Sequence, residues 1–255
     1  MSYFTKDMTI KVLSRLQAFE KQIHDTYKSF DYDSRENLGR RNMIMSQAQE
    51  KEVARALRES FKNVIQDGRP GRADIFVEDI GRELECKITS GSKSKGSVSY
   101  SLQTDWATLK KKKSIDFLFI VTNETFDRFC VMFFDSLTSD DFHFPANGSR
   151  GKARMHKENA MKKMTVLYGD VVDYNEKMIN SYEKNIKRID LKHQDKITNV
   201  LTKGLNENKI ISNVHNSVDK LEKIYEKRIG EIKNKIKYWR NTSKRYSVKL
   251  KEYPE

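Results

Sequence analysis

The sequence predicts an α/β fold in which helices flank a mixed β-sheet core, with a long helical extension at the C-terminus. Two observations lead to this expectation. Before Pro145, short apolar runs typical of strands are interleaved with segments of helical periodicity. After Pro145 the strand signals stop, and apolar residues recur at every third or fourth position. We therefore expect two parts, N-terminal helices with a sheet core over 1–145 and a basic helical region over 146–255.

Two helices are expected before the sheet. Residues 5–30 have apolar residues at helical spacing, and the polar stretch 31–42 is expected to be a loop. The second helix is expected to begin near Ser46, because SQAQ fits a capping box with Gln49 three residues further on. A cluster of turn-forming residues from Gln66 to Ala73 is expected to end this helix.

The sheet is expected between residues 74 and 134. Its elements are, in order, strands over 74–78 and 82–88, a helix over 102–112, and strands over 115–122 and 128–134. Residues 79–81 supply the turn between the first two strands. The run 115–122 (IDFLFIVT) is almost wholly apolar, which is typical of a strand buried on both faces.

The C-terminal region is expected to be helical throughout. Helices are predicted over 153–168, 171–203 and 213–240, and the last of these would be about 40 Å long. Residues 204–208 (GLNEN) suit a turn that brings the last helix back on the one before it. The pattern therefore favours a helical hairpin or the seam of a dimer.

The composition favours a cytoplasmic protein with no membrane-spanning segment. No apolar run of this 255-residue chain approaches the ~18–20 residues that a membrane helix needs. The N-terminus also lacks the apolar segment of a secretory signal. Cys86 and Cys130 both fall inside expected strands, so we expect reduced core cysteines, with a disulfide as the alternative.

The positive charge is concentrated in the last two fifths of the chain. Residues 151–255 hold 25 Lys and Arg against 14 Asp and Glu, whereas residues 1–150 hold 24 against 22. A polyanion is one partner that suits such a surface, because its phosphates release counterions on binding. The alternative is a solubilising surface on a lysine-rich helical tail.

The expected strand over 82–88 carries charges at alternate positions. The charged residues are Glu83, Glu85 and Lys87, and the apolar residues between and after them are Leu84, Cys86 and Ile88. Since residues two apart share a face of a strand, the charges lie together and the apolar residues face the core. Asp74, at the start of the preceding strand, would lie close to Lys87 and within reach of Glu85. Two carboxylates and one ammonium are thus expected at one edge of the sheet.

This set of groups suits metal-dependent hydrolysis of a phosphodiester. Carboxylate oxygens are hard ligands that bind Mg²⁺, which polarises a phosphodiester and lowers the pKa of bound water. We expect Asp74 and Glu85 to bind the metal, joined by the carbonyl of Cys86. Lys87 would orient or deprotonate the water, or stabilise the charge that develops on the phosphate. The alternative is a solvated face of an edge hairpin.

The arrangement Asp74…Glu85-Cys86-Lys87 resembles the PD-(D/E)xK nuclease superfamily, the fold of most type II restriction endonucleases. Ala73 stands where the family has proline, and the resemblance covers residues 46–134. It implies a restriction-endonuclease-like core made of a helix, a three-strand meander, a helix and another strand. Family members often carry a further acidic residue on the helix before the hairpin. Glu50 is the candidate here, and its alternative is a first-turn glutamate favoured by the helix dipole.

The resemblance implies a Mg²⁺-dependent endonuclease that acts on double-stranded DNA. A sequence-specific type II restriction enzyme is the first expectation, and cleavage at a palindrome would favour a homodimer. A phage, homing or repair nuclease of the same fold is an alternative. So is a non-catalytic, basic coiled-coil protein that binds nucleic acid.

Basic and polar residues near the expected site are candidates for DNA contacts. Two lysines follow the charged strand, a glutamine lies on the expected helix after it, and the loop 147–157 is rich in Arg and Lys. The candidates are Lys93, Lys95, Gln103, Arg150, Lys152, Arg154 and Lys157. Arginine can pair with guanine in the major groove. A basic surface loop is the alternative for 147–157.

Overall fold

The structure, a computed structural model, divides the chain into two units. The described residues are 2–67, 69, 72–90, 103–144, 151–206, 211–242 and 245–253. The α/β unit comprises residues 1–172 and 246–255, and the hairpin unit comprises residues 173–245. The boundary differs from the one expected between 145 and 146, because strands continue beyond that point within the α/β unit.

A mixed sheet forms the centre of the α/β unit. Its seven described strands are ordered β1-β2-β3-β5-β6-β12, and β9 also pairs with β6. Their bounds are β1 Val64–Gln66, β2 Ile75–Val77, β3 Arg82–Ser90, β5 Ile115–Thr122, β6 Arg128–Leu137, β9 Met164–Tyr168 and β12 Lys251–Glu252. β3 and β5 run parallel, whereas β1–β2, β2–β3 and β5–β6 are antiparallel. The expected mixed α/β architecture is therefore confirmed.

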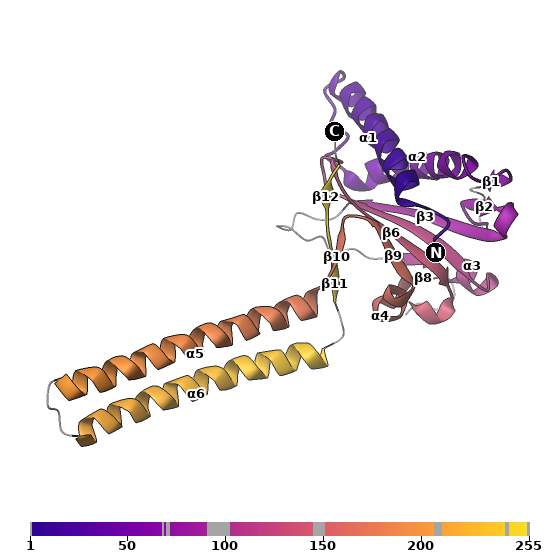
Figure 1. Ribbon diagram of the computed structural model, residues 1–255. Helices are drawn as coiled ribbons and strands as arrows, with labels where there is room; N and C mark the ends of the chain where they lie inside the picture. Colours follow the sequence, from indigo (N-terminus) through magenta and orange to yellow (C-terminus); the bar gives the residue numbers. More distant parts are fainter. Residues whose placement is uncertain are drawn as a thin grey trace. The chain divides into compact units, whose positions relative to one another are not determined.

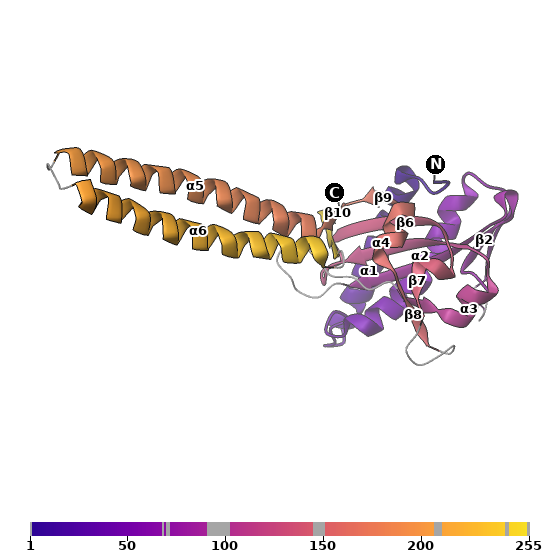
Figure 2. The same ribbon diagram turned by 90° about the horizontal axis from the view of Figure 1, so that it is seen from below.

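The two faces of this sheet are covered by different elements (Figures 1 and 2). Helices α1 (Lys6–Lys28) and α2 (Leu38–Arg58) cover one face. The other face is covered by two short helices and a small sheet of order β4-β8-β7. Those elements are α3 Trp106–Lys111, α4 Lys157–Ala160, β4 Gln103–Asp105, β7 Phe142–His143 and β8 Lys152–Met155.

Each face of the sheet has its own hydrophobic core. On β5, Leu118 and Ile120 belong to the core beneath α1 and α2, while Phe117 and Phe119 belong to the core on the opposite face. Every residue of β5 is buried, which confirms the prediction of a strand covered on both sides.

The two cysteines are buried and free, as expected. Cys86 contributes to the core beneath α1 and α2, and Cys130 contributes to the core on the opposite face. The sheet therefore separates the two sulfur atoms.

The start of α2 was predicted wrongly. The helix begins at Leu38, and the side chain of its N-cap Asn37 accepts a hydrogen bond from the Arg40 N–H at 3.1 Å. Ser46 therefore lies inside the helix, and part of the expected loop 31–42 is helical. The polar sequence of this segment suggested a loop. One of its polar residues, Arg41, is in fact buried, with only 2 % exposed, and forms an ion pair with Glu20.

Several short strands were also missed. β1 occupies the end of the predicted second helix and the start of the expected turn, and β4 replaces the start of the expected helix 102–112. β8, α4 and β9 replace the helix expected over 153–168, and two further strands, β10 (Asp170–Asp173) and β11 (Tyr246–Lys249), pair with each other. Each of these strands is too short for its own periodicity to outweigh neighbouring patterns, and each depends on a distant partner such as β8 for β4.

The hairpin unit consists of two long helices, α5 (Tyr174–Asn206) and α6 (Ile211–Asn241), which run side by side (Figure 1). The predicted helical hairpin is confirmed. Its described core contains Ile189, Ile229, Ile232 and Ile236. Near the tip the helices approach closely, since a Cβ added to Gly204 would lie 2.6 Å from the side chain of Val214. Among the described residues, no helix combines the length and apolar character needed to cross a membrane.

A buried carboxylate joins the chain's N-terminus to the sheet. Asp116 on β5 is 1 % exposed and accepts hydrogen bonds from Arg82 at 2.8 and 2.5 Å, from the Tyr3 hydroxyl at 3.0 Å and from the Ser136 N–H at 2.7 Å. Burial and this carboxylate raise the pKa of Tyr3 well above its usual range. Arg82 also pairs with Asp135, which is exposed.

Replacement of Asp116 by alanine should destabilise the protein by at least about 2 kcal/mol, because the partly exposed Arg82, the Tyr3 hydroxyl and the Ser136 amide would lose their buried acceptor together. The matched control is Asp135→Ala, which removes the exposed partner of the same arginine and should cost less than about 1 kcal/mol. Urea unfolding of both variants measures the difference. Equal losses would contradict the structural role of Asp116.

Candidate active site at the edge of the sheet

The β2–β3 hairpin positions the charged residues of β3. The strands pair from Ile75 opposite Leu84 to Val77 opposite Arg82. A short 3₁₀ turn and Gly81, at φ 62°, close the hairpin, and glycine adopts this left-handed conformation at no steric cost. Because β2 begins only at Ile75, the part of β3 beyond Leu84 has no β2 partner. Glu85 and Lys87 lie on that part.

Asp74 occupies the place where β2 would otherwise continue. Its carbonyl accepts a hydrogen bond from the Asp67 N–H at 3.0 Å, which fixes its backbone. Its Oδ2 accepts a hydrogen bond from the Cys86 N–H at 2.7 Å. In a strand, the N–H and C=O of one residue point to the same edge, so the Cys86 carbonyl is directed toward the edge where Asp74 lies.

Glu85 and Lys87 share a face of β3, as expected, and they form an ion pair. The Lys87 Nζ donates to Glu85 Oε1 at 2.6 Å, and their side chains are 34 % and 14 % exposed for lysine and glutamate respectively. Glu83, on the same face, pairs instead with Lys112 at 3.0 Å. The charges on this strand therefore belong to two different clusters, and only the cluster of Glu85 and Lys87 contains Asp74.

Glu50 joins this cluster from α2. Burial raises the pKa of Glu50, Lys87 lowers it and Glu85 raises it, so all three lie within electrostatic reach of one another. Glu52, two residues further along α2, points elsewhere and pairs with Arg15 and Arg55. We name Asp74, Glu85, Lys87 and Glu50 the carboxylate cluster.

The cluster brings three carboxylates close to one ammonium, and the pKa values of Asp74 and Lys87 are both raised. Burial and then the charge of Glu85 raise the pKa of Asp74 to about 7, although Lys87 and the Cys86 N–H act in the opposite direction. Burial alone would lower the pKa of Lys87, but Glu85 and Asp74 raise it above its ordinary value. Lys87 therefore stays charged at neutral pH, while the carboxylates repel one another.

The donor atoms of the cluster suit a hard divalent cation. Carboxylate oxygens of Asp74 and Glu85 and the Cys86 carbonyl oxygen are ligands that Mg²⁺ accepts, and Mg²⁺ commonly keeps several waters in addition. A divalent cation would also relieve the repulsion that raises the pKa of Asp74. Among the described residues, no three His, Cys, Asp or Glu side chains form a metal site by themselves. The remaining ligands would therefore be water or substrate oxygens.

Gln49 supports the cluster from beneath, although it was not among the residues predicted for the site. It is fully buried on α2, next to Glu50, and its Nε2 donates to the carbonyls of Lys87 and Leu118 at 3.3 Å each. These bonds tie α2 to β3 at the position of Lys87. The apolar periodicity of α2 carried a signal for it, because Gln49 falls on the buried face.

The expected DNA-contacting residues are only partly described. Lys93, Lys95 and Arg150, together with the side chain of Lys157, lie outside the described part of the structure. Gln103 lies on β4, not on a helix as expected, and is paired in register with Arg154 on β8. Lys152 and Arg154 are exposed on β8, where they alternate with the buried Ala153 and Met155. The structure therefore places three of these residues on the small sheet.

In comparisons with protein-family models, curated proteins and solved structures, nothing matches this chain. The interpretation of the carboxylate cluster therefore depends on its own geometry and chemistry.

Asp74→Asn should stabilise the metal-free protein at about pH 8 by at least ~1 kcal/mol, the free energy of a one-unit change in pKa. The folded pKa of about 7 lies above the ordinary value of 3.8, so the folded state holds a proton that the unfolded state has lost. Stability of the wild type therefore falls as pH rises from about 4 to about 7. The variant lacks this fall, and its advantage should disappear below about pH 4. Urea unfolding in EDTA across this range measures it.

Asp79→Asn is the matched control in the hairpin turn. Hydrogen bonds from the backbone and side chain of Asn63 lower the pKa of Asp79, so its charge stabilises the folded state. This variant should be less stable than the wild type at neutral pH, and the difference should shrink as pH falls through the folded pKa of Asp79. The same pH response in both variants would contradict the unfavourable environment of the Asp74 carboxylate.

Proposed function

We propose that this protein is a Mg²⁺-dependent endonuclease that hydrolyses phosphodiester bonds of double-stranded DNA. One observation carries the proposal. Asp74, Glu85, Lys87 and Glu50 meet at the edge of β3 next to the start of β2, where the Asp74 carboxylate accepts a hydrogen bond from the Cys86 N–H. Hydrolysis of this kind uses two carboxylates that can bind a metal ion and a lysine beside them.

The order of the elements supports a restriction-endonuclease-like core. α2 is followed by the antiparallel meander β1-β2-β3, then by α3 and β5. The resemblance to the PD-(D/E)xK nucleases implies a helix, a three-strand meander, a helix and another strand, in that order. β1 supplies the third strand of the meander, which was not predicted from the sequence.

Each residue of the cluster has a role in the proposed reaction. Asp74, Glu85 and the carbonyl of Cys86 would hold Mg²⁺, with Glu50 beside them on α2. When bound, Mg²⁺ supplies Lewis-acid polarisation of the phosphodiester and of the attacking water. Asp74 reaches its working state by losing its proton, so binding of the metal is expected to strengthen as pH rises through about 7.

Lys87 acts in this proposal as a cation and hydrogen-bond donor. Its pKa lies above the ordinary value because of Glu85 and Asp74, so it is a poor base at neutral pH. Held by Glu85 at 2.6 Å, its ammonium can orient the attacking water and stabilise negative charge on the phosphate in the transition state.

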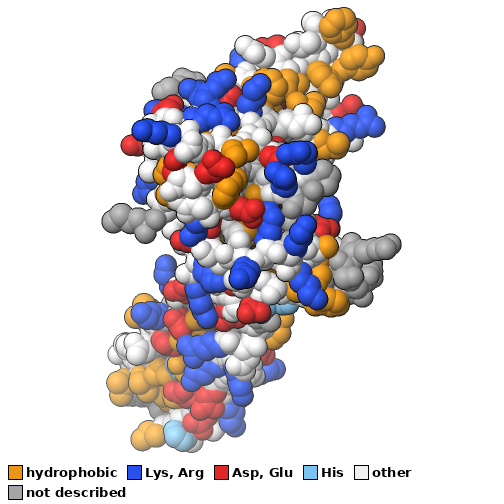
Figure 3. All heavy atoms as spheres, turned by 90° about the vertical axis from the view of Figure 1, so that its right-hand side faces the viewer, with side chains coloured by type: hydrophobic (Ala, Val, Ile, Leu, Met, Phe, Trp, Pro, Cys, Tyr) orange, Lys and Arg blue, Asp and Glu red, His pale blue; other side chains and the backbone are white. Residues whose placement is uncertain are grey.

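Charge supports DNA as the substrate, because the chain has a net charge of +13. Lys and Arg side chains are spread among acidic ones over the face seen in Figure 3. Lys152 and Arg154 form a basic pair on the exposed face of β8. A sequence-specific type II restriction enzyme that acts as a homodimer is the finer form of the proposal.

Glu85→Ala should abolish Mg²⁺-dependent cleavage of plasmid and phage DNA, with a loss of at least ~100-fold in rate. Lys87→Ala should lose a similar factor while DNA binding is retained. Glu83→Ala is the matched control, because it removes a glutamate from the same face of the same strand but one that pairs with Lys112. It should cleave like the wild type. Agarose gels with Mg²⁺ or EDTA provide the readout.

The pattern of products separates the finer possibilities. Discrete fragments that disappear in EDTA and in Glu85→Ala would support a sequence-specific enzyme. A smear that also disappears in EDTA and in Glu85→Ala would support an endonuclease but contradict a sequence-specific restriction enzyme. DNA that stays intact with Mg²⁺ but is shifted in the gel would overturn the endonuclease proposal and favour a non-catalytic binding protein.

A further inference from the structure

Most of the chain's net positive charge lies in the hairpin unit. Residues 173–245 contain 18 Lys and Arg against 10 Asp and Glu, which is a net charge of +8 out of +13. A count alone is compatible with an evenly solvated surface. The structure adds that some of these cations gather around one pocket between α5 and α6.

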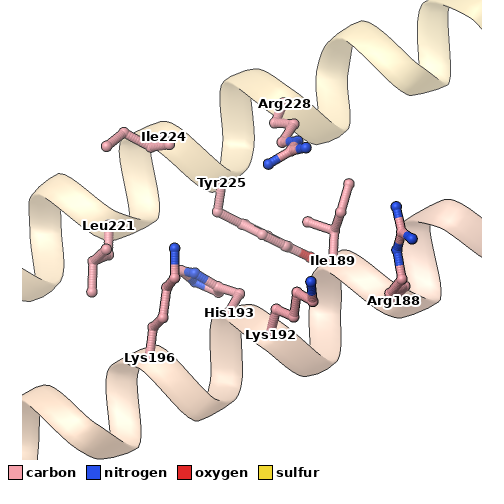
Figure 4. Close-up of a pocket in the computed structure, with 9 residues that line it drawn as sticks. All are labelled: Arg188, Ile189, Lys192, His193, Lys196, Leu221, Ile224, Tyr225 and Arg228. Atoms are coloured by element: carbon pink, nitrogen blue, oxygen red, sulfur yellow. The ribbon is translucent and has the colours of Figure 1, made fainter.

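The pocket combines four cationic side chains with two stacked aromatic rings (Figure 4). Arg188, Lys192 and Lys196 extend from α5 toward α6, and Arg228 extends from α6 toward α5. We name these four residues and the space between them the cationic pocket. Its volume is about 130 Å³, well below the ~300–1,000 Å³ of sites for small organic molecules.

The spacing of the α5 cations suits an extended anion. Arg188, Lys192 and Lys196 recur at intervals of four residues, so they share one face of the helix. Successive members are ~6 Å apart along the helix axis, and the row spans ~12 Å. That length exceeds a single phosphate group and matches a run of phosphates on a nucleic-acid strand.

Two acidic residues beside the pocket contact its aromatic residues and not its cations. Asp190 Oδ1 accepts a hydrogen bond from the Tyr225 hydroxyl at 2.8 Å, and Glu222 lies 3.3 Å from the ring of His193. Among the described residues, no carboxylate lies within ion-pair distance of Lys192, Lys196 or Arg228. The fourth cation, Arg188, donates to the neutral amide oxygen of Asn185 at 3.1 Å. None of the four cations is thus in an ion pair with a described carboxylate.

The aromatic pair forms a wall of the pocket. The rings of His193 and Tyr225 stack on each other with centroids 4.2 Å apart and planes 11° apart. Each ring thus already has a stacking partner, and the Tyr225 hydroxyl is held by Asp190. The small volume of the pocket, about 130 Å³, and its four cations suit phosphates better than a stacked base. Contacts to phosphates carry no sequence information directly.

We propose that the cationic pocket binds successive backbone phosphates of a nucleic acid and supplies sequence-independent affinity. The inference rests on the proposed function for the identity of the polyanion, and it deepens that function by assigning a binding surface to the hairpin unit. The pocket lies more than 100 residues along the chain from the carboxylate cluster, and none of its residues belongs to that cluster. Binding through the pocket can therefore be measured without cleavage.

The experiment compares two fourfold variants of the full chain that lose the same number of charges from the same two helices. The pocket variant is Arg188→Gln, Lys192→Gln, Lys196→Gln and Arg228→Gln. The control variant is Lys187→Gln, Lys223→Gln, Lys233→Gln and Lys237→Gln, all at exposed positions that do not line the pocket. Binding of two labelled DNA duplexes of unrelated sequence is measured by fluorescence anisotropy in EDTA, over a range of NaCl concentrations.

The pocket variant should bind both duplexes at least ~10-fold more weakly than the control variant, and the slope of its salt dependence should be smaller by about 0.9 for each phosphate that it no longer neutralises. The double variant Lys192→Gln, Lys196→Gln should show a smaller loss of the same kind, and it changes only exposed side chains. Equal losses in the pocket and control variants would overturn the proposal, since charge alone would then explain binding. Unchanged binding in the pocket variant would overturn it too.

The result is independent of the cleavage assay. Failure of Glu83→Ala and wild type to cleave any DNA would count against the endonuclease, even if the pocket variant loses binding. Conversely, if the wild type cleaves DNA and the pocket variant binds DNA as well as the wild type does, the proposal for the cationic pocket is overturned and the proposal for the carboxylate cluster stands.

Discussion

The hydrogen bond from the Cys86 amide to the Asp74 carboxylate, at 2.7 Å, is the constraint on which the candidate site depends. It lies next to the start of β2 at Ile75, and from there on β3 continues without β2 beside it. A backbone N–H at a sheet edge needs an acceptor, and here a side chain provides it instead of a strand. The same bond holds a carboxylate at the edge toward which Cys86 directs its carbonyl. Asp74 thereby provides both the acceptor that the Cys86 amide needs and a carboxylate at the candidate site.

The rest of the α/β unit holds β3 in place so that this edge can carry charge. β3 is anchored by parallel pairing with the fully buried β5, and α2 is bonded to its backbone through Gln49. Leu84 and Cys86 fill the core beneath α1 and α2 while Glu85 and Lys87 occupy the other face. Burial on one face stabilises the strand. This stability offsets the cost of burying the Asp74 carboxyl and of its repulsion by Glu85, and both of these effects raise the pKa of Asp74.

Local periodicity was enough to predict those parts of the protein that follow from one backbone conformation. The alternation of Glu85, Cys86 and Lys87, the continuous apolar run of β5 and the three- and four-residue spacing of α6 are all of this kind. The hairpin geometry that brings Asp74 to β3 followed from the same patterns. Local patterns therefore predicted the grouping of Asp74, Glu85 and Lys87 and the helical hairpin, whereas Glu50 was expected only from the family resemblance.

The meeting of side chains across separate elements could not be predicted in this way. β1, β4 and β8 have too few residues to show a period, and they exist because distant strands pair with them. The burial of Arg41 depends on Glu20 of another helix, so its polarity misled the prediction of α2. Arg228 meets the α5 cations only because α6 folds back on α5. Periodicity shows which face of an element is buried, but which distant residues meet on that face depends on tertiary packing and leaves no periodic trace in the sequence.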